Sequence, residues 1–528
     1  MKKWKKMLAA VLTIVMIFAL SSCGGGGNEE TTEASGSNEL VIAIQDEIEG
    51  TDIQQIGWEN IVQALLYEPL IRYNTAMDEV VPAFAEKFEQ SEDGMTLTFT
   101  LPEDAKFCNG AACDAEAVKA SFERYIEISE YSTDFAPIES IETPDERTVV
   151  FKLSSPAPFM MANLTSTYGG LVDAAAASEM EKDAFNRKAV GNGPYAVEEW
   201  VQGSHITLTK NEYYKTNFAD VENKGVLAFD KITIRFIPDE FTRVSELESG
   251  SVDVIYNVPA ASVADLSENE GVTLYDYEQP GVTFINMQTG KGALADPAVR
   301  EAMIYAINRD EVVKALDDMI TPAYSFVNEA QVCYSEDFAK EAEKKYAFDP
   351  DKSKQILKDA GYKDSDGDGI LEKDGKKLSI ELLTASNRTT TKNSAPIIQK
   401  QLMNVGIDAQ IREYESAYIK QMHRDDDYDV TFSNYEWTDP DMLLSLFTPS
   451  SGYPWSNEEV TALLEKARIE PDADKRTELY VQAQQKVIDE KKALPLFSDN
   501  NYIAAKSNVK GIIVTIDGRT YLNDTVKE

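Results

Sequence analysis

The stretch APIIQKQLMNVGIDAQI, residues 395–411, decides the fold class of this chain. Gly406 interrupts its helical pattern, and the apolar side chains of residues 407–411 then alternate, as they do in a strand. A helix that ends at glycine and leads into a strand is the repeating unit of α/β proteins. The sequence therefore predicts an α/β fold. The apolar positions of the helical part are Ala395, Ile398, Leu402 and Val405.

Other helical patterns in the second half begin with clear start signals. An acid followed by proline stands at Asp296-Pro297 and at Asp349-Pro350, where it favours an N-cap and a first helical residue. Asn308 and Glu311 have the spacing of a capping box. A further apolar stripe runs through residues 479–487. We expect these stripes to pack in a core and to carry no chemistry of their own.

The first half is richer in strands. Its apolar residues alternate or form short runs bounded by turn residues such as Asp93-Gly94, which is typical of strands and hairpins. The strands predicted in this way cover residues 40–44, 96–101, 148–153, and a hairpin of 195–201 with 205–210.

The charge of the chain excludes one class of partner. The 528 residues contain 51 Lys and Arg against 91 Asp and Glu, for a net charge of −40. So acidic a chain does not neutralise phosphates, so we expect no nucleic acid to bind. Its length predicts two or three domains.

The first residues have the pattern of an export signal. Four lysines precede the apolar run Met7 to Leu20, which is too short to span a bilayer comfortably. Leu20-Ser21-Ser22-Cys23 follows and resembles the lipobox of bacterial lipoproteins, in which the cysteine carries acyl chains. We therefore expect a signal peptide at 1–22 and lipidation of Cys23. An ordinary signal peptide with a chance cysteine is the alternative.

Residues 23–37 cannot bury a core, because glycine and polar residues dominate them. We expect this segment to be a flexible tether between the lipid anchor and a globular body.

Cysteine and histidine give little support for a disulfide framework or a metal site. Cys108 and Cys113 could close a small loop in an oxidising environment, or could be two free thiols, and Cys333 has no obvious partner. His205 and His423 lack ligand spacing. We therefore expect no metal and no cofactor.

Two motifs point to sites that their surroundings do not support. GNGPYA at 191–196 matches a dinucleotide-binding pattern, but a hairpin is predicted directly after it, where that motif needs a helix. Asp364, Asp366 and Asp368 match half of a calcium loop, but Gly375 stands where the loop needs glutamate. We interpret this segment as an acidic turn.

Short motifs recur along the chain in a familiar order. This order resembles the large extracytoplasmic solute-binding family that serves ABC importers of dipeptides, oligopeptides and nickel, over essentially all of residues 38–528. The motifs are YEPL (67–70), PAFAE (82–86), SEDG (91–94), GNGPY (191–195), GSVD (250–253), DPAVR (296–300), AINR (306–309), AGY (360–362) and LPLF (494–497).

The resemblance implies a periplasmic-binding-protein-like fold of two α/β lobes joined by a hinge, with an extra domain inserted in the first lobe. The hinge would fall near residues 281–286 and 494–497. The expected boundaries are 38–65, 188–280 and 497–528 for lobe 1, 66–187 for the inserted domain, and 281–496 for lobe 2.

The resemblance also nominates residues that bind the two charged ends of a peptide. In the segment YEWTDPD, residues 435–441, Asp439 matches the position that pairs with the ligand amine in peptide receptors. That segment has a separate acid before its Asp-Pro pair in such receptors and is shorter here, so Asp439 or Asp441 could instead shape a turn. Arg388 matches an arginine that meets the ligand carboxylate, with a plain surface role as its alternative.

Three aromatic residues are candidates for the walls of the ligand cleft. Trp437 and Tyr435 belong to the same segment as Asp439, and Trp58 could face them from the other lobe. Aromatic side chains provide contact area at little cost in conformational entropy. Core packing is the alternative for each.

Together these features predict a non-catalytic receptor at the extracytoplasmic face of the cell membrane. We expect a monomer that captures a peptide and delivers it to ABC permease subunits. A sugar, a nickel chelate or another small solute remains open as the ligand. An exported lipoprotein hydrolase and a surface protein such as an adhesin are the alternatives of other classes.

Overall fold

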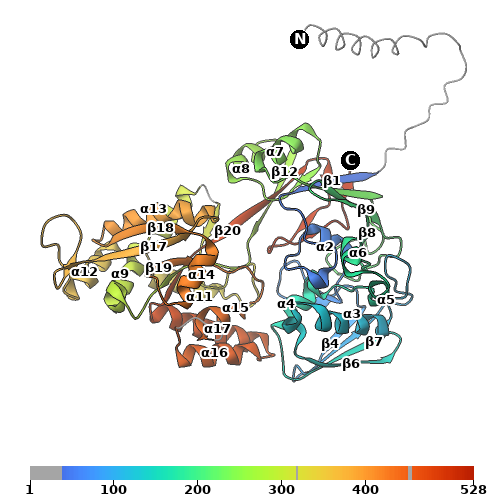
Figure 1. Cartoon of the computed structure of the whole chain (residues 1–528), viewed down its shortest axis with the longest axis horizontal. Coiled ribbons are helices and arrows are strands. Elements are labelled where there is room, and N and C mark those ends of the chain that lie inside the picture. Colours follow the sequence, from blue (N-terminus) through green and yellow to red (C-terminus); the bar gives the residue numbers. More distant parts are fainter. Residues whose placement is uncertain (1–37, 317–318, 450–454) are drawn as a thin grey trace, which may run out of the picture. The chain divides into compact units, whose positions relative to one another are not determined.

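The computed structural model describes residues 38–316, 319–449 and 455–528 of the chain (Figure 1). The predicted signal peptide (1–22), the tether (23–37) and Cys23 lie outside these residues. Among the helices of the described residues, none combines the length and the apolar character that a membrane span requires.

The fold is built on one large mixed sheet, which confirms the predicted α/β class. In the described residues its strands follow the order β18-β17-β19-β13-β20-β11-β1-β10-β9-β8, and β12 and β14 also pair with β20. The strands are β1 (Glu39–Ile44), β8 (Tyr195–Val201), β9 (His205–Lys210), β10 (Lys231–Phe236), β11 (Val254–Ile255), β12 (Val272–Glu278), β13 (Thr283–Met287), β14 (Ile320–Pro322), β17 (Ser379–Ala385), β18 (Asp408–Tyr414), β19 (Val430–Ser433) and β20 (Ala493–Lys506).

The helix and strand predicted from residues 395–411 belong to a βαβ unit. Strand β17 leads into α13 (Thr389–Met403) and then into β18, which pairs with β17 in parallel from Ser379↔Asp408 to Ala385↔Tyr414. Gly406 ends the helical segment with a φ of +90°, a conformation that favours glycine. Parallel strands need such a crossover helix, so this sequence pattern fixed the local topology.

The predicted helix starts are also confirmed. Asp296 accepts a hydrogen bond from the N–H of Ala298 at the start of α9 (Pro297–Ala306). Asp349 caps α12 (Pro350–Asp359) through the N–H of Lys352. Asn308 caps α10 (Arg309–Ala315), and the stripe at 479–487 lies within α17 (Ala473–Asp489).

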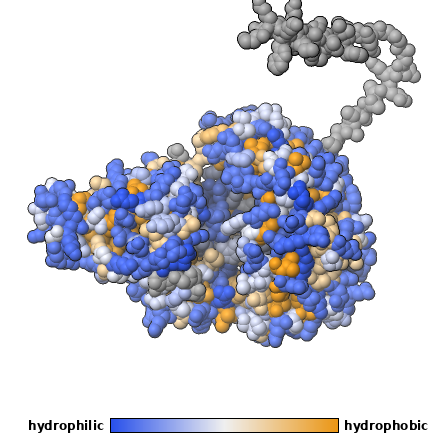
Figure 2. Space-filling view, viewed as in Figure 1, coloured by the Kyte–Doolittle hydropathy of each residue, from blue (hydrophilic) through white to orange (hydrophobic). Residues whose placement is uncertain are grey.

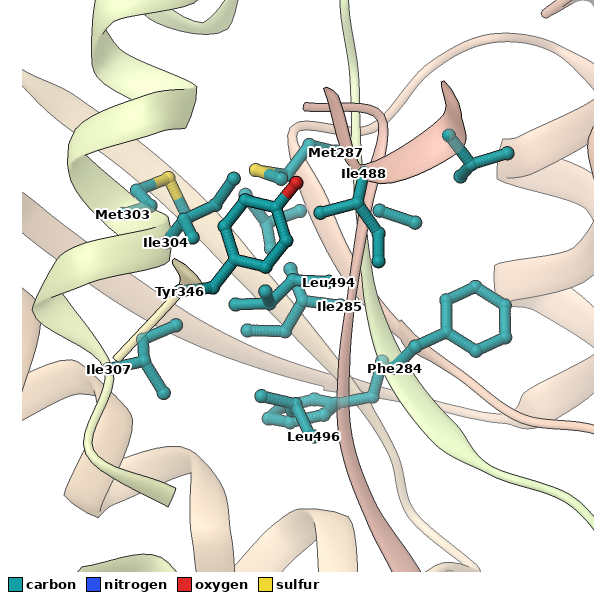
Figure 3. Close-up of a cluster of buried hydrophobic side chains, with 14 of the residues drawn as sticks. Phe284, Ile285, Met287, Met303, Ile304, Ile307, Tyr346, Ile488, Leu494 and Leu496 are labelled. Atoms are coloured by element: carbon teal, nitrogen blue, oxygen red, sulfur yellow. The ribbon is translucent and has the colours of Figure 1, made fainter. Parts of the chain in front are cut away.

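The largest hydrophobic core lies between α9 and the strands β13 and β20 (Figure 3). Met303 and Ile304 of α9, and Ile307 directly after it, point toward Ile285 of β13 and Leu494 of β20. All five side chains are buried. Each buried side chain of this size contributes about 1.5–3 kcal/mol, so this contact holds the helix against the sheet.

The strands predicted in the first half form two separate structures. The hairpin β8–β9 joins the large sheet, and its predicted bounds are confirmed. A second, four-stranded sheet packs against α3 (Ala115–Ile128) through T-shaped ring contacts of Phe122 with Phe151, 4.9 Å between centroids. Its order is β4 (Lys87–Gln90), β5 (Thr96–Thr100), β7 (Thr148–Leu153), β6 (Ile138–Asp145).

Shorter elements complete the described residues. The other helices of four turns or fewer are α2 (Ile61–Leu66), α4 (Met160–Thr165), α5 (Ala174–Ser178), α6 (Lys182–Arg187), α7 (Glu240–Ser249), α8 (Ala260–Ser267), α11 (Glu336–Lys345), α14 (Ser416–Arg424), α15 (Met442–Phe447) and α16 (Glu458–Arg468). The 3₁₀ turns are η1 (Ile53–Gln55), η2 (Ser132–Phe135), η3 (Thr167–Gly169) and η4 (Gly292–Ala295). Short strand pairs are β2 (Ile71–Tyr73) with β3 (Val80–Pro82), β15 (Glu372–Lys373) with β16 (Lys376–Lys377), β21 (Val509–Lys510) with β24 (Val526–Lys527), and β22 (Ile513–Val514) with β23 (Thr520–Tyr521).

Strand β20 belongs to both halves of the large sheet (Figure 1). Its first residues pair with β13 up to Thr283↔Phe497, and its later residues pair with β12 from Glu278↔Asn500 onward. The chain therefore crosses between the two halves twice, at 279–282 and at 498–499. We call these two segments the crossing segments.

Asn328 ties the two crossing segments together. Its Nδ2 donates to the carbonyl oxygens of Gln279 (2.8 Å) and Gly281 (3.2 Å) and to the Ser498 hydroxyl (3.1 Å). The N–H of Gly281 donates back to Asn328 Oδ1 at 3.3 Å. One buried amide thus satisfies the backbone where the ladder of β20 changes partner.

The predicted domain boundaries stay predictions, since residues 38–528 form one unit. Three of the hydrophobic cores of this unit draw on different parts of the chain. One lies within residues 284–497, one within 70–171, and the third combines residues from 40–67, 168–254 and 503–522.

The three cysteines of the described residues are free thiols. Cys113 is buried and Cys108 is half-buried, and burial raises the pKa of both thiols. The free-thiol interpretation therefore describes this structure.

Gly281 provides a test of the crossing segments. Its φ is +129°, and a Cβ added there would lie 1.9 Å from the carbonyl oxygen of Tyr435. We expect Gly281→Ala to lower the free energy of unfolding by well over the 1–3 kcal/mol that an unfavourable φ alone costs, measured by urea unfolding. Gly361→Ala is the matched control, because its φ is +91° and nothing lies within 4 Å of the added Cβ. Equal losses for the two variants would contradict the close contact.

Candidate functional site

The segment 435–441 is fixed against one crossing segment. The N–H of Trp437 donates to the carbonyl oxygen of Pro280 at 2.9 Å, and Gln331 Nε2 donates to the carbonyl oxygen of Trp437 at 2.7 Å. The segment follows β19 and leads to α15. Its side chains are therefore held beside the point where β20 changes partner.

Asp439 lies in the interior and is paired with an arginine. Its side chain has no exposed surface, and its two oxygens accept from Arg476 Nη1 (2.9 Å) and Nη2 (2.8 Å). Asp439 Oδ1 also accepts from the N–H of Asp441 at 2.8 Å. With both oxygens engaged, this geometry favours the turn-shaping role and does not support the predicted amine-binding role.

Asp441 is mostly buried and belongs to a second ion pair. Its Oδ2 lies 3.0 Å from Arg468 Nη1, and the Arg468 guanidinium lies over the ring of Phe159, 4.2 Å from the centroid. Burial raises the pKa of Asp441 to about 6, against the opposing effect of Arg468. Asp441 therefore connects residues from distant parts of the chain, and its role here is structural.

Tyr435 is part of the core rather than a wall of the site. Its side chain is buried in the largest hydrophobic core, and its hydroxyl donates to the carbonyl oxygen of Phe326. The alternative of core packing therefore describes Tyr435.

Trp437 is half-buried and packs against two different hydrophobic cores. Its ring lies 6.4 Å from that of Tyr168, centroid to centroid. The Tyr168 hydroxyl donates to the carbonyl oxygen of Gly57 at 2.8 Å, next to Trp58, which is 73% exposed. The structure thus brings the loop of Trp58 close to Trp437 through Tyr168, and it leaves the Trp58 ring free to meet a ligand.

Arg388 is paired with a residue that the sequence did not single out. It stands directly before α13, and its Nη1 donates to Glu436 Oε1 at 2.6 Å. About a third of each side chain is exposed, 36% for Arg388 and 33% for Glu436. Asn434 Nδ2 also donates to Glu436 Oε1, at 3.2 Å. This ion pair is accessible, in contrast to that of Asp439.

Two further polar side chains approach this ion pair. Asp499 of β20 interacts electrostatically with both Arg388 and Glu436. Burial raises the pKa of Tyr277 of β12 to about 12, and the charges of Asp517 and Glu436 contribute to this rise. The candidate site is therefore the group Arg388, Glu436, Trp437, Asp499 and Tyr277, beside the crossing segments.

Two hollows border this region. The face of the molecule drawn in Figure 2 is largely hydrophilic, with scattered hydrophobic residues. A cavity of about 100 Å³ is lined by Arg388, Asn434 and Asn286. A larger one, about 490 Å³, lies on the Ser498 side of β20, and Tyr277 is the one residue of the candidate site in its lining. Because successive residues of a strand point to opposite faces, Asp499 lies on the other face, with Arg388. We therefore place the candidate site on the Asp499 face.

The acidic turn offers no comparable arrangement. The carboxylates of Asp364, Asp366 and Asp368 converge, but all three residues are exposed. Asp364 accepts from the N–H groups of Gly367 and Gly369, and Lys377 pairs with the other two acids. These bonds account for the turn without a metal.

Glu436 and Asp499 are the charged residues of the site that sequence reasoning missed. Glu436 carried a usable signal, because it is an acid within the nominated segment 435–441. Asp499 carried none, because only the pairing of β20 brings it to Arg388.

Comparison with known proteins identifies the family. The family model of "Bacterial extracellular solute-binding proteins, family 5 Middle" matches residues 79–455, which is more than half of the chain. The chain belongs to this family. Its members are solute-binding proteins, so this family 5 protein is a binding protein and not an enzyme.

Individual relatives cover nearly the whole chain. The oligopeptide-binding protein AppA of Bacillus subtilis is 26% identical, over 97% of this chain and 96% of its own length. The probable D,D-dipeptide-binding periplasmic protein DdpA of Escherichia coli is also 26% identical, over 85% of each chain.

Solved structures agree with the two-lobed fold of the family. NikA from Brucella suis in complex with Fe(III)-EDTA has a TM-score of 0.79 at 24% identity, over 93% of this chain and all of that one. AppA from Bacillus subtilis in complex with a nonapeptide has a TM-score of 0.68 at 22% identity, over 93% of this chain and 99% of that one.

The structural role of Asp439 can be tested through its partner. We expect Arg476→Ala to lower the free energy of unfolding by about 3–5 kcal/mol, because it leaves a buried carboxylate unpaired. Arg412→Ala is the control, because it breaks an ion pair with Glu381 in which both side chains are 47% exposed, and such pairs contribute about 0–1 kcal/mol. Urea unfolding followed by circular dichroism measures both. If Arg476→Ala lowers the free energy of unfolding by less than about 1 kcal/mol, the structural role of Asp439 is contradicted and Asp439 is again a candidate for ligand binding.

Proposed function

We propose that this protein is the peptide receptor of an ABC importer. Relatives named for oligopeptides, D,D-dipeptides and glutathione support a peptide ligand. The observation that carries the proposal is the accessible Arg388–Glu436 ion pair beside Trp437. A peptide has one ammonium and one carboxylate end, and this pair offers one partner for each.

The ion pair suits ligand exchange. An exposed pair of this kind contributes only about 0–1 kcal/mol to the fold, so its opening costs little. A peptide that enters between the two side chains replaces one internal ion pair with two ligand ion pairs. Its ammonium binds Glu436 and its carboxylate binds Arg388, in a charge-assisted contact that is stronger than a neutral hydrogen bond.

The aromatic residues suit the middle of the ligand. The half-buried Trp437 offers a ring next to the ion pair, and the exposed Trp58 extends this surface outward. Aromatic faces tolerate varied side chains, so such walls serve a receptor that accepts more than one peptide sequence.

Lobe closure links binding to delivery. With lobe 1 at 38–65, 188–280 and 497–528, an inserted domain at 66–187 and lobe 2 at 281–496, the ligand lies at the crossing segments. A ligand that contacts both lobes stabilises the closed state and presents it to the permease subunits.

We also propose a lipid anchor at Cys23 for the exported protein. The cationic start, the short apolar run and Leu20-Ser21-Ser22-Cys23 support it. Several acyl chains together give stable attachment, because each buried CH₂ contributes about 0.8 kcal/mol. The protein then acts as a monomer at the extracytoplasmic face, tethered by residues 23–37.

A metal chelate is the second candidate ligand. A structural neighbour, NikA, is in complex with Fe(III)-EDTA, and another, NikZ from Campylobacter jejuni, with Ni(L-His). Arg388 could receive an anionic chelate, although Glu436 would then have to leave the site.

Calorimetry on the purified protein distinguishes the two candidates. We expect a mixed pool of short peptides to bind the parent, and Ni(II)–histidine to bind at least tenfold more weakly. Arg388→Ala and Glu436→Gln should each weaken peptide binding by about 2–5 kcal/mol, because each leaves one charged end of the ligand unpaired.

Arg424→Ala is the control, since this exposed arginine lies outside the site. Native mass spectrometry of protein from its host identifies the ligand that copurifies. If both site variants bind peptides like the parent, the proposed site is misplaced. If only the nickel complex binds, the peptide function fails.

A further inference from the structure

The strand that joins the two halves of the sheet carries a carboxylate that faces the candidate site. Asp499 lies in β20, opposite Ile320 of β14, and its carbonyl oxygen accepts from the N–H of Gln279 at 2.9 Å. Its backbone is therefore fixed within the crossing segments. Its side chain interacts with Arg388 and Glu436.

One oxygen of the Asp499 carboxylate has no hydrogen-bond partner among the described residues. The Thr390 hydroxyl bonds the carboxylate, while Oδ1 is buried and accepts no hydrogen bond from the described residues. Burial raises the pKa of Asp499, and the Thr390 hydrogen bond and Arg388 oppose this rise. An unsatisfied buried oxygen costs about 1–3 kcal/mol, and a ligand that donates to it removes this cost.

The candidate site carries more negative than positive charge. Arg388 contributes one positive charge, and Glu436 and Asp499 contribute two negative charges. The nearby carboxylate of Asp517 is compensated by Arg519, 3.1 Å away, and Tyr277 stays neutral. A peptide with one ammonium and one carboxylate matches Arg388 and Glu436 and leaves Asp499 uncompensated.

From this imbalance we propose that Asp499 makes the site select ligands with one more positive than negative charge. The substrate class is a peptide with a lysine or arginine side chain. The extra cationic group binds Asp499 on the strand shared by both halves of the sheet. This proposal rests on the peptide-receptor function proposed above.

A charge series of peptides tests the proposal by calorimetry. The set is Ala-Ala-Lys-Ala, Ala-Ala-Arg-Ala, tetra-alanine and Ala-Ala-Glu-Ala, which differ in net charge at equal length. For the parent, we expect the lysine and arginine peptides to bind at least about tenfold more tightly than tetra-alanine, and the glutamate peptide to bind most weakly.

Asp499→Asn should reduce the preference for the cationic peptides to less than about threefold, since it removes the charge and keeps the size. Asp351→Asn is the matched control: it removes the same charge from an exposed position on α12 and should keep the parent's preference. Thermal unfolding checks that the Asp499→Asn variant is folded, and Asp499→Ser serves if it is not.

The outcomes separate the two proposals. If the parent binds tetra-alanine as tightly as the cationic peptides, or if the Asp499 variants keep the full preference, the selectivity proposal is overturned while the peptide function stands. If the parent binds none of the four peptides, the peptide function itself fails.

Discussion

The sharing of one strand by two halves of a sheet is the constraint on which the rest of this structure depends. Strand β20 pairs with β13 at one end and with β12 at the other, so both halves are continuous with it. Asn328 links the two crossing segments where the partner changes, by bonding the backbone of Gln279 and the hydroxyl of Ser498. Because the segment 435–441 is anchored on Pro280, the candidate site is built directly on this junction.

Two ion pairs near this junction differ in what they can do. The Asp439–Arg476 pair is buried and bidentate, so its charges compensate each other and are closed to a ligand. The Arg388–Glu436 pair is about one-third exposed and adjoins Trp437 and Asp499. An ion pair between an arginine and a carboxylate therefore stabilises the fold in one place and is accessible to a ligand in the other. The two pairs differ in how far they are buried.

The family membership and the site geometry support each other at different levels. The match over residues 79–455 establishes an extracellular solute-binding protein. The proposal of a ligand with separated charges and an excess of positive charge rests on the arrangement of Arg388, Glu436 and Asp499. Solved neighbours in complex with a nonapeptide and with metal chelates illustrate how far ligands differ on one fold.

Much of the fold was readable from the sequence, because its determinants are local. Gly406 and the apolar spacing around it determined α13 and β18, and Asp296-Pro297 and Asp349-Pro350 determined where two helices begin. The alternating residues of 195–210 determined the β8–β9 hairpin. In each case the signal and the structure lie within a few residues of each other.

The candidate site was only partly readable, because its charges come from distant positions. The sequence nominated Arg388 and Trp437, which lie in the site, together with Asp439 and Tyr435, which lie in the interior. Whether an acid is free for a ligand depends on its partner, and Arg476 reaches Asp439 only through tertiary packing. Likewise, Asp499 and Arg388 are far apart in the chain, and only the tertiary structure brings their charges close enough to interact. The sequence by itself thus determined the fold class, the helix starts and the family, whereas the tertiary structure decided which charges are compensated, since compensation depends on distances between residues that are far apart in the chain.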